Sequence, residues 1–330
     1  HVFGSETIVI NKRIVRLSTE GAEQVYNGTA LINPNWAEDS DSEGFVTGQG
    51  FATSATTGTI TNVGTANNGF TYTLNGATKP GNYTVDVTEG VLKVTKANTL
   101  SVDATDYSGK YDGSAHGVTA SANVPGGTTI RYSLTNSTNP ADYTLTVSPT
   151  ATHVDDSRKV YFVATNDNYE PAFGDAQITI LPRTITLTGA TQSETYNGSA
   201  LTNSTVTIGG DNFLSGEGYS VLPTATGTIT NVGSVANPVS GGTLNSSTQA
   251  HDYAISTQSG TLTVTPATLT VQANDQQIAY PAGRPATGTL TYTLVGGNVA
   301  GETPAFGGVL GYDTNLAADP LNPGTYTDAI

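Results

Sequence analysis

The sequence contains no cysteine and no methionine, and it has a single tryptophan among 330 residues. The absence of cysteine excludes disulfide frameworks, thiolate zinc sites and cysteine nucleophiles. Basic residues are also scarce, because 12 Lys and Arg stand against 27 Asp and Glu and leave a formal net charge of −15. Such an acidic chain, without a basic cluster, lacks the positive surface that nucleic-acid binding requires. We therefore expect no nucleic-acid partner.

Long apolar runs are missing as well. No run approaches the roughly 18 apolar residues that a membrane-spanning helix requires, so we expect no membrane insertion in this segment. Residues 1–4 lack the charged and apolar regions of a signal peptide, as the mature form of a secreted protein also would.

Motifs of common catalytic sites are absent from the sequence. No Gly-x-Ser-x-Gly element frames a serine, and no His-Glu-x-x-His motif or phosphate-binding loop is present. The four histidines are scattered and occupy no shared position of the repeats described below. We therefore expect no enzyme, no catalytic residues and no cofactor.

The chain contains an internal repeat. A tyrosine followed by Asn or Asp and then Gly occurs three times at equal intervals, at Tyr26-Asn27-Gly28, Tyr111-Asp112-Gly113 and Tyr196-Asn197-Gly198. Because Asn-Gly and Asp-Gly accept the positive φ of a tight turn, these residues are predicted to be structural turn residues. The sequence Gly-Thr-Ile-Thr-Asn-Val-Gly at 58–64 recurs at 227–233.

A second tyrosine follows each turn at a nearly constant distance. Tyr83 and Tyr253 are equally far from the tyrosine of their own turn, and Tyr169 lies one position farther from its turn. Each is preceded by Asn or Asp. We predict that these three tyrosines bury their rings and hydrogen-bond a loop, as a tyrosine corner does in β-sandwiches.

The ends of each copy have the pattern of half-buried β-strands. Apolar and polar residues alternate with period two in the closing segments 91–94, 177–180 and 261–264. No stretch shows a helical period over three turns. We predict an all-β fold of tandem immunoglobulin-like β-sandwich repeats arranged as a rod. The predicted segments are 1–11, 12–96, 97–182, 183–266 and 267–330.

Residues 1–11 resemble a closing strand rather than the start of a repeat. The segment 4–10 followed by Arg13 matches 174–180 followed by Arg183. The second tyrosine of the fourth copy would fall past Ile330, so segment 267–330 is predicted to lack a closing strand. Two interpretations stay open. The chain is a segment cut out of phase from a longer array, or residues Thr7, Ile8, Val9 and Ile10 of one molecule complete the 267–330 module of the next, which would produce a head-to-tail filament.

An acidic loop in the first copy is the candidate metal site. Asp39, Asp41 and Glu43 place carboxylates at alternate positions before Gly44, as an oxygen-ligand loop for calcium would. The EF-hand pattern requires a Glu where Gly50 stands, so that motif is not completed. The alternative interpretation is a solvated acidic loop without a metal.

Several of these motifs resemble a known family. The Tyr-[Asn/Asp]-Gly turn, the Gly-Thr-Ile-Thr-Asn-Val-Gly segment and the Gly-Thr-Leu-Thr-Val-Thr-Pro-Ala sequence at 260–267 resemble the tandem MBG and YDG repeats of large bacterial surface adhesins, which include filamentous-haemagglutinin-like exoproteins. The resemblance covers nearly the whole chain. It implies a secreted, multi-domain stalk and no catalytic residues. The second copy departs from the pattern and resembles a different subtype.

These observations favour a structural protein at the cell surface. The first hypothesis is a stalk or filament segment of an extracellular adhesin, which projects or links the cell surface or biofilm matrix. Its partners would be neighbouring modules or identical subunits. The alternative is a binding array for surface glycans, matrix or host proteins, in which Trp36 or Tyr219 of the long loops would present an aromatic platform.

Overall fold

The computed structural model describes residues 4, 6–279, 282–313, 324–325 and 330, which form β-strands and short 3-10 helices without an α-helix. The chain divides into two compact units, His1–Leu181 and Pro182–Ile330. Within the described part, no helix has the length and apolar character needed to cross a membrane. The all-β class predicted from the period-two pattern is confirmed.

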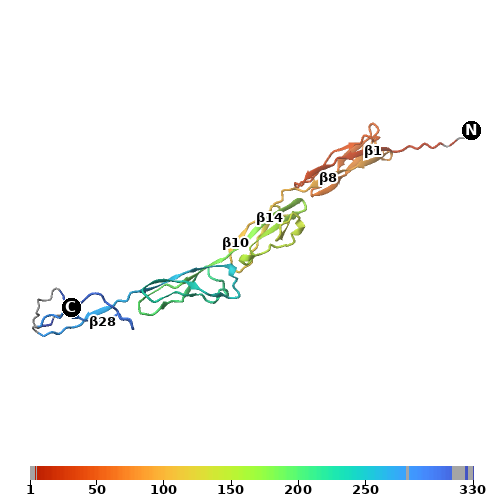
Figure 1. Ribbon diagram of the computed structural model, residues 1–330. Helices are drawn as coiled ribbons and strands as arrows, with labels where there is room; N and C mark the ends of the chain where they lie inside the picture. The colour runs from red at the N-terminus through yellow and green to blue at the C-terminus, as the bar shows by residue number, and fades with distance from the viewer. Residues whose placement is uncertain (1–3, 5, 280–281, 314–323, 326–329) are drawn as a thin grey trace. The chain divides into compact units, whose positions relative to one another are not determined.

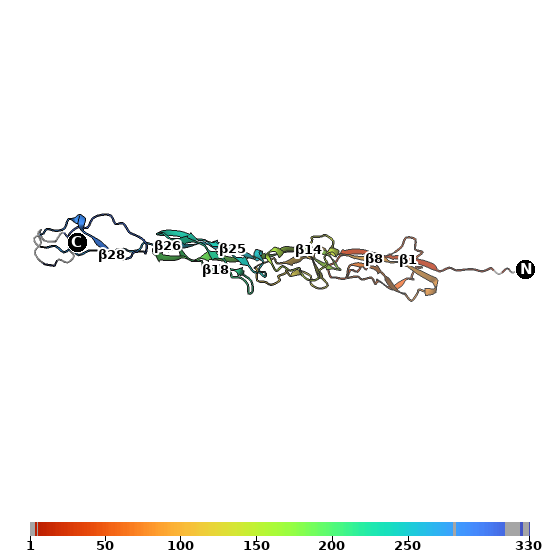
Figure 2. The ribbon, with the colours of Figure 1, turned by 60° about the horizontal axis from the view of Figure 1, so that its bottom comes forward.

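The first repeat folds into two three-stranded sheets and a hairpin (Figures 1 and 2). One sheet has the order β3-β1-β7, the other has the order β2-β8-β5, and β4 pairs with β6. The 3-10 helix η1 (Pro80–Asn82) precedes β7. The strands are β1 (Arg13–Thr19), β2 (Ala22–Val25), β3 (Trp36–Glu38), β4 (Phe51–Thr56), β5 (Gly64–Asn68), β6 (Phe70–Leu74), β7 (Tyr83–Thr88) and β8 (Gly90–Thr95).

The core of this repeat lies between its two sheets. Val15 and Leu17 from β1 and Leu92 and Val94 from β8 are each at most 2% exposed. Successive residues of a strand point to opposite faces, so the alternation of apolar and polar residues places these four side chains on the inner faces. The period-two pattern therefore produces a β-sandwich with its own small core.

The third repeat has the same topology. Its two main sheets have the orders β18-β15-β25 and β16-β26-β22, and the parallel register Arg13↔Tyr83 of the first repeat recurs as Arg183↔Tyr253. The 3-10 helix η4 (Ala250–Asp252) precedes β25. The strands are β15 (Arg183–Gly189), β16 (Gln192–Thr195), β17 (Leu201–Thr202), β18 (Val206–Gly210), β19 (Tyr219–Val221), β20 (Thr224–Ala225), β21 (Thr228–Ile229), β22 (Gly233–Asn237), β23 (Val239–Ser240), β24 (Thr243–Leu244), β25 (Tyr253–Gln258) and β26 (Gly260–Thr265).

The second repeat has a different arrangement of strands. A four-stranded sheet has the order β10-β14-β13-β12, and β11 pairs with β9. A long hairpin joins β13 and β14, whose register shifts between Ala164 and Asn166. Its elements are β9 (Val102–Ala104), β10 (Tyr107–Lys110), β11 (Ala120–Ala122), β12 (Thr129–Ser133), η2 (Pro140–Asp142), η3 (Val154–Asp156), β13 (Arg158–Asn166) and β14 (Tyr169–Leu181).

The described part of the last segment contains one antiparallel pair of strands, β27 (Thr270–Ala273) and β28 (Tyr292–Gly296), together with η5 (Thr287–Thr289). The strands of the three preceding repeats fall within 13–95, 102–181 and 183–265. Because the compact units number two, the division of the chain into five segments stays a prediction.

Candidate functional site

The last strand of each complete repeat pairs in parallel with a short strand that leads into the Tyr-Asn/Asp-Gly turn. We call β8, β14 and β26 the closing strands, and β2, β10 and β16 the turn strands. The closing strand lies between the turn strand and an antiparallel neighbour in all three repeats. The pairing starts at Ala22↔Leu92, Tyr107↔Ile178 and Gln192↔Leu262. In each repeat, the first paired residue of the turn strand lies four positions before the tyrosine of the turn.

Each closing strand contributes at least two side chains to the core. Ile178 and Ile180 of β14 are 0% and 2% exposed, and Leu262 and Val264 of β26 are 0% and 4% exposed. In the third repeat, Leu262 and Val264 form an apolar cluster with Leu201. A repeat without its closing strand would therefore lose part of its core and a row of main-chain hydrogen bonds.

The candidate donor residues of the N-terminal segment form no strand. Thr7, Ile8, Val9 and Ile10 are described but belong to no sheet, and the segment precedes β1 without a neighbouring strand (Figures 1 and 2). Ile8 is 87% exposed and Ile10 is 90% exposed. These two residues match Ile178 and Ile180 in the sequence, which are buried in the second repeat.

The last segment also exposes residues that are buried in the other repeats. Leu269 and Val271 match Ile185 and Leu187 of the third repeat. Ile185 and Leu187 are 0% and 3% exposed, whereas Leu269 and Val271 are 37% and 47% exposed. The residues 276–279, which occupy the position of a turn strand, are described and form no strand. Tyr280 and Pro281 of the corresponding turn lie outside the described residues.

The Tyr-Asn/Asp-Gly turns share one local geometry. Gly28, Gly113 and Gly198 have φ values of 80°, 78° and 80°. The preceding side-chain oxygen accepts a hydrogen bond from the backbone N–H two residues ahead, at 2.9 Å for Asn27 and 2.8 Å for Asn197. Asp112 accepts the same bond at 2.8 Å. This is an Asx turn, and glycine supplies the left-handed conformation that it requires.

In the first unit, the turn of the first repeat contacts the hairpin tip of the second. The rings of Tyr26 and Tyr169 meet edge to face at 5.3 Å and 78°. The backbone N–H of Val63 donates to Asn168 Oδ1 at 2.9 Å, and Asn168 Nδ2 donates to Asn62 Oδ1 at 3.1 Å. Asn62 and Val63 belong to the Gly-Thr-Ile-Thr-Asn-Val-Gly segment, so two of the repeated motifs meet at this module junction.

The linker takes part in the same junction. The backbone N–H of Ala97 donates to the carbonyl of Asn168 at 3.1 Å, and the N–H of Glu170 donates to the carbonyl of Ala97 at 2.8 Å. Ala97 is 4% exposed. The residue that joins the two repeats is therefore held against the second one by backbone hydrogen bonds.

In the second unit, the turn of the third repeat contacts the last segment. The Tyr196 hydroxyl donates to Glu302 Oε1, and this hydrogen bond raises the pKa of Tyr196 above its ordinary value. A Cβ on Gly198 would lie 2.6 Å from Val299 Cγ1. A cavity of about 520 Å³ lies beside these residues, lined mainly by apolar side chains such as Val232 and Leu269. The tyrosine of the turn thus meets the following segment in both units.

Two of the predicted corner tyrosines have matching environments. The Tyr83 hydroxyl donates to Gln49 Oε1 at 2.6 Å and accepts from the N–H of Val46 at 3.2 Å. The Tyr253 hydroxyl donates to Glu217 Oε2 at 2.7 Å and accepts from the N–H of Leu214. Burial raises the pKa of Tyr253 to about 12. Both rings are nearly buried, at 6% and 5% exposure.

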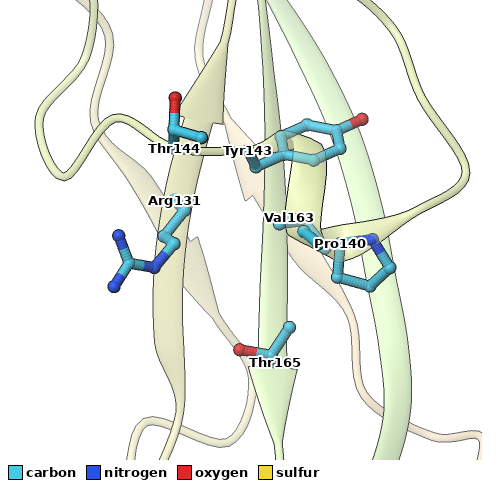
Figure 3. Close-up of a pocket in the computed structure, with 7 residues that line it drawn as sticks. Arg131, Pro140, Tyr143, Thr144, Val163 and Thr165 are labelled. Carbon is cyan, nitrogen blue, oxygen red and sulfur yellow. The ribbon is translucent and has the colours of Figure 1, made fainter.

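In the second repeat, Tyr143 and not Tyr169 occupies the corner. Tyr143 is 1% exposed, follows η2 as Tyr83 follows η1, and donates to the carbonyl of Ser137 at 2.9 Å. Figure 3 shows its ring beside Pro140 and Val163, while the Arg131 guanidinium points away from it. Tyr169 instead begins β14 and contacts Tyr26. The first and second repeats share the sequence Pro-x-[Asn/Asp]-Tyr at this corner, whereas Ala250 replaces the proline in the third repeat. A constant spacing from the turn does not detect Tyr143, because the second repeat has different loops.

The carboxylates of the candidate calcium loop hold the loop against β1. Asp39 Oδ1 accepts from Ser18 Oγ at 2.7 Å, Asp41 pairs with Arg16 at 3.2 Å, and Glu43 Oε2 accepts from the N–H of Ile14 at 2.6 Å. In the third repeat, Asp211 accepts from the N–H of Thr184 in the same way. Among the described residues, no group of three or more His, Asp or Glu side chains is placed to hold a metal ion.

Two equivalent buried asparagines, one in the first repeat and one in the third, were not identified from the sequence. Asn68 is 0% exposed, and its Nδ2 donates to the carbonyls of Glu20 and Asn33, both at 2.9 Å. Its Oδ1 accepts from the N–H of Gly58 at 3.2 Å. Asn237 repeats this network in the third repeat. The signal was present, because each Asn stands at the same distance from the first Gly of the repeated heptapeptide.

The two aromatics predicted to lie in long loops and to form a glycan platform instead begin strands β3 and β19, and they pack against other rings. Trp36 contacts Phe70 at 4.9 Å and 61° and Phe51 at 5.8 Å and 75°. Tyr219 contacts Phe213 at 5.6 Å and 84°. These edge-to-face contacts give both side chains a packing role within their own repeat.

The sequence matches no family model and none of the curated proteins. Similar solved structures are arrays of immunoglobulin domains. Sidekick-1 immunoglobulin domains 1–5 is 12% identical, with a TM-score of 0.24, over 78% of this chain and 61% of that chain. The N-terminal four Ig domains of Dscam1 isoform 9.44 are 10% identical, with a TM-score of 0.20, over 76% of this chain and 73% of that chain. This chain thus spans 61% of the length of the Sidekick-1 structure.

Proposed function

We propose that this chain is a structural segment of an extracellular bacterial adhesin, a stalk or filament part that projects or links the cell surface or biofilm matrix. Two observations support a structural role. The repeats have separate sandwich cores, and the residues that recur along the chain, such as Tyr26, Tyr196 and Val63, contact the following segment. The resemblance of the motifs to MBG and YDG repeats supports the placement at the cell surface.

We further propose that identical subunits join head to tail by exchange of a closing strand. The observation that carries this step is the exposure of Ile8 and Ile10, at 87% and 90%, where the matching Ile178 and Ile180 are core residues. Burial of an isoleucine side chain contributes about 1.5–3 kcal/mol, so the pair would contribute about 3–6 kcal/mol before ordering costs. Main-chain hydrogen bonds to an open sheet edge would add to this.

The assembly state of the whole chain tests the joining step. We expect residues 1–330 to form linear oligomers in light scattering and electron microscopy, and a version without residues 1–11 to stay monomeric. A matched pair of substitutions refines the test. Ile10→Asp should abolish oligomers, because its counterpart Ile180 is 2% exposed, whereas Val9→Asp should be tolerated, because its counterpart Thr179 is not buried. Monomers from the intact chain would refute the joining step and leave the stalk as a segment of a longer array.

A further inference from the structure

We infer that the first and third repeats bear tension through a parallel ladder of strand pairs that is loaded in shear, so that a pull on the chain loads all of these pairs together. The ladder is formed by the strands through which the chain enters and leaves each repeat. The inference rests on the structural role proposed above and specifies how a segment with that role would bear force.

The ladder of the first repeat continues from one sheet into the other. β1 pairs in parallel with β7, and β2 pairs in parallel with β8. In both strand pairs, the partner residues are 70 positions apart in the sequence. Because this register is unchanged, β1 with β2 and β7 with β8 form two continuous sides of one ladder, which contains ten residue pairs from Arg13↔Tyr83 to Val25↔Thr95.

The two sides of the ladder stay in contact where they cross between the sheets. Thr19 is 5% exposed, and its Oγ1 accepts a hydrogen bond from the N–H of Gly90 at 2.9 Å. A Cβ on Gly21 would lie 2.6 Å from the carbonyl oxygen of Val91, and a Cβ on Gly90 would lie 2.5 Å from the carbonyl oxygen of Thr19. Glycine permits this close approach of two backbones. The crossing therefore does not interrupt the ladder.

The third repeat has the same ladder, and the second repeat has a shorter one. In the third repeat, β15 with β25 and β16 with β26 share the offset of 70 residues, from Arg183↔Tyr253 to Thr195↔Thr265. In the second repeat, β9 pairs with β11, and the parallel contacts are four pairs of β10 with β14 and the single bridge Ala97↔Tyr169. The inference therefore concerns the first and third repeats.

The direction of the load follows from the ladder. The chain enters the first repeat at the start of β1 and leaves it at the end of β8. Because the two sides are parallel, these points lie at opposite ends of the ladder. A pull at both points acts along the strands, so the ten residue pairs resist it together and not one after another. Residues 26–82 join the two sides and are not stretched until the ladder breaks.

Force measurements on single full-length chains test the inference. The chain contains no cysteine, so two introduced cysteines are the only thiols to which handles can be attached. Lys12→Cys with Lys96→Cys applies the force at opposite ends of the ladder and loads it in shear. Ala30→Cys with Lys96→Cys applies the force at positions that follow β2 and β8, at the same end, so the ladder opens one pair at a time. All three positions are exposed.

The two pulling geometries should give different unfolding forces. At equal loading rates, we expect the force in shear to be at least about twofold higher than the force in the peeling geometry. The fluorescence of Trp36, the only tryptophan, verifies that the first repeat is folded in both variants. An equal or lower force in shear would overturn the inference and leave the result of the assembly experiment unaffected. Monomers in the assembly experiment would refute the joining step without changing the force in shear, so the two failures are distinguishable.

Discussion

The side chain of Asn168 accepts a hydrogen bond from the backbone N–H of Val63 at 2.9 Å, across 105 residues of sequence. Asn168 also donates to Asn62, and its carbonyl accepts from the linker residue Ala97. One asparagine of the second repeat therefore joins the linker and the first repeat. Because the side-chain oxygen and nitrogen of Asn168 both form hydrogen bonds, they fix the position of Asn168 against Val63 and Asn62.

Replacement of Asn168 should loosen this junction without unfolding either repeat. Asn168→Ala removes the acceptor of the Val63 N–H, and we expect a local loss of about 1–2 kcal/mol, which corresponds to about five- to thirtyfold faster hydrogen exchange at Val63. Asp167→Ala, at the neighbouring exposed position, is the matched control and should leave the exchange unchanged. Equal exchange rates in both variants would show that the hydrogen bond has no role in the junction.

The buried asparagine of the first repeat should be important for stability. Asn68→Ala leaves two backbone carbonyls and one N–H without their partner, so we expect the free energy of unfolding to fall by about 2–4 kcal/mol. Trp36 is the only tryptophan, so its fluorescence during urea unfolding reports on the first repeat alone. Asn67→Ala removes only an exposed bond to Glu89 and should cost less than about 1 kcal/mol. A similar fall in the free energy of unfolding in Asn68→Ala and Asn67→Ala would contradict the stabilising role of the buried Asn68.

The glycines of two Tyr-Asn-Gly turns should differ in their tolerance of a side chain. Both have φ near 80°, so alanine costs about 1–2 kcal/mol of backbone strain at either position. A Cβ at Gly28 has no neighbour within 4 Å, whereas one at Gly198 meets Val299 at 2.6 Å. Gly198→Ala should therefore also displace the last segment from the third repeat. Retention of the raised pKa of Tyr196 in this variant would show that no displacement occurs.

The contact between Tyr196 and Glu302 should depend on pH. The hydrogen bond to Glu302 raises the pKa of Tyr196, so the neutral tyrosine is the form that the contact stabilises. A group whose pKa is raised by folding stabilises the folded state at pH values below its pKa in the unfolded chain, which is about 10 for tyrosine. This stabilisation is lost as the pH rises through the pKa of the group in the folded protein. Ultraviolet titration should show several tyrosines that ionise late, Tyr253 among them, and in Glu302→Gln one of these ionisations should shift to lower pH. An unchanged titration would exclude the contact.

The two tyrosines of the second repeat should have different roles. Tyr143→Ala removes a ring that is 1% exposed together with its bond to Ser137, so we expect a loss of about 3–5 kcal/mol in the stability of this repeat. Tyr169→Ala removes the ring contact to Tyr26 at the junction and should cost less. Urea unfolding followed by circular dichroism compares the two variants. A larger loss of stability in Tyr169→Ala than in Tyr143→Ala would show that Tyr169 is the corner tyrosine.

The sequence by itself determined the features that depend on neighbouring residues. Alternation of apolar and polar residues predicted the strands, and Asn-Gly and Asp-Gly predicted the turns at Gly28, Gly113 and Gly198. The match of Ile8 and Ile10 to Ile178 and Ile180 could also be read directly from the chain. Strand alternation and positive φ are local properties, so local sequence is sufficient to predict them.

Only the tertiary structure decided which distant residues meet. It placed Tyr143 rather than Tyr169 at the corner, buried Asn68 between two loops and turned the carboxylate of Glu43 onto the backbone of β1. It also revealed the parallel pairing of closing and turn strands. Tyr143 and Ser137 are only six residues apart, but Glu43 and Ile14 are separated by 29 residues and Asn68 and Glu20 by 48. Such distant partners are selected by the packing of whole sheets, and many residues of the same type compete for each partner. Residue type and spacing alone therefore do not specify these contacts.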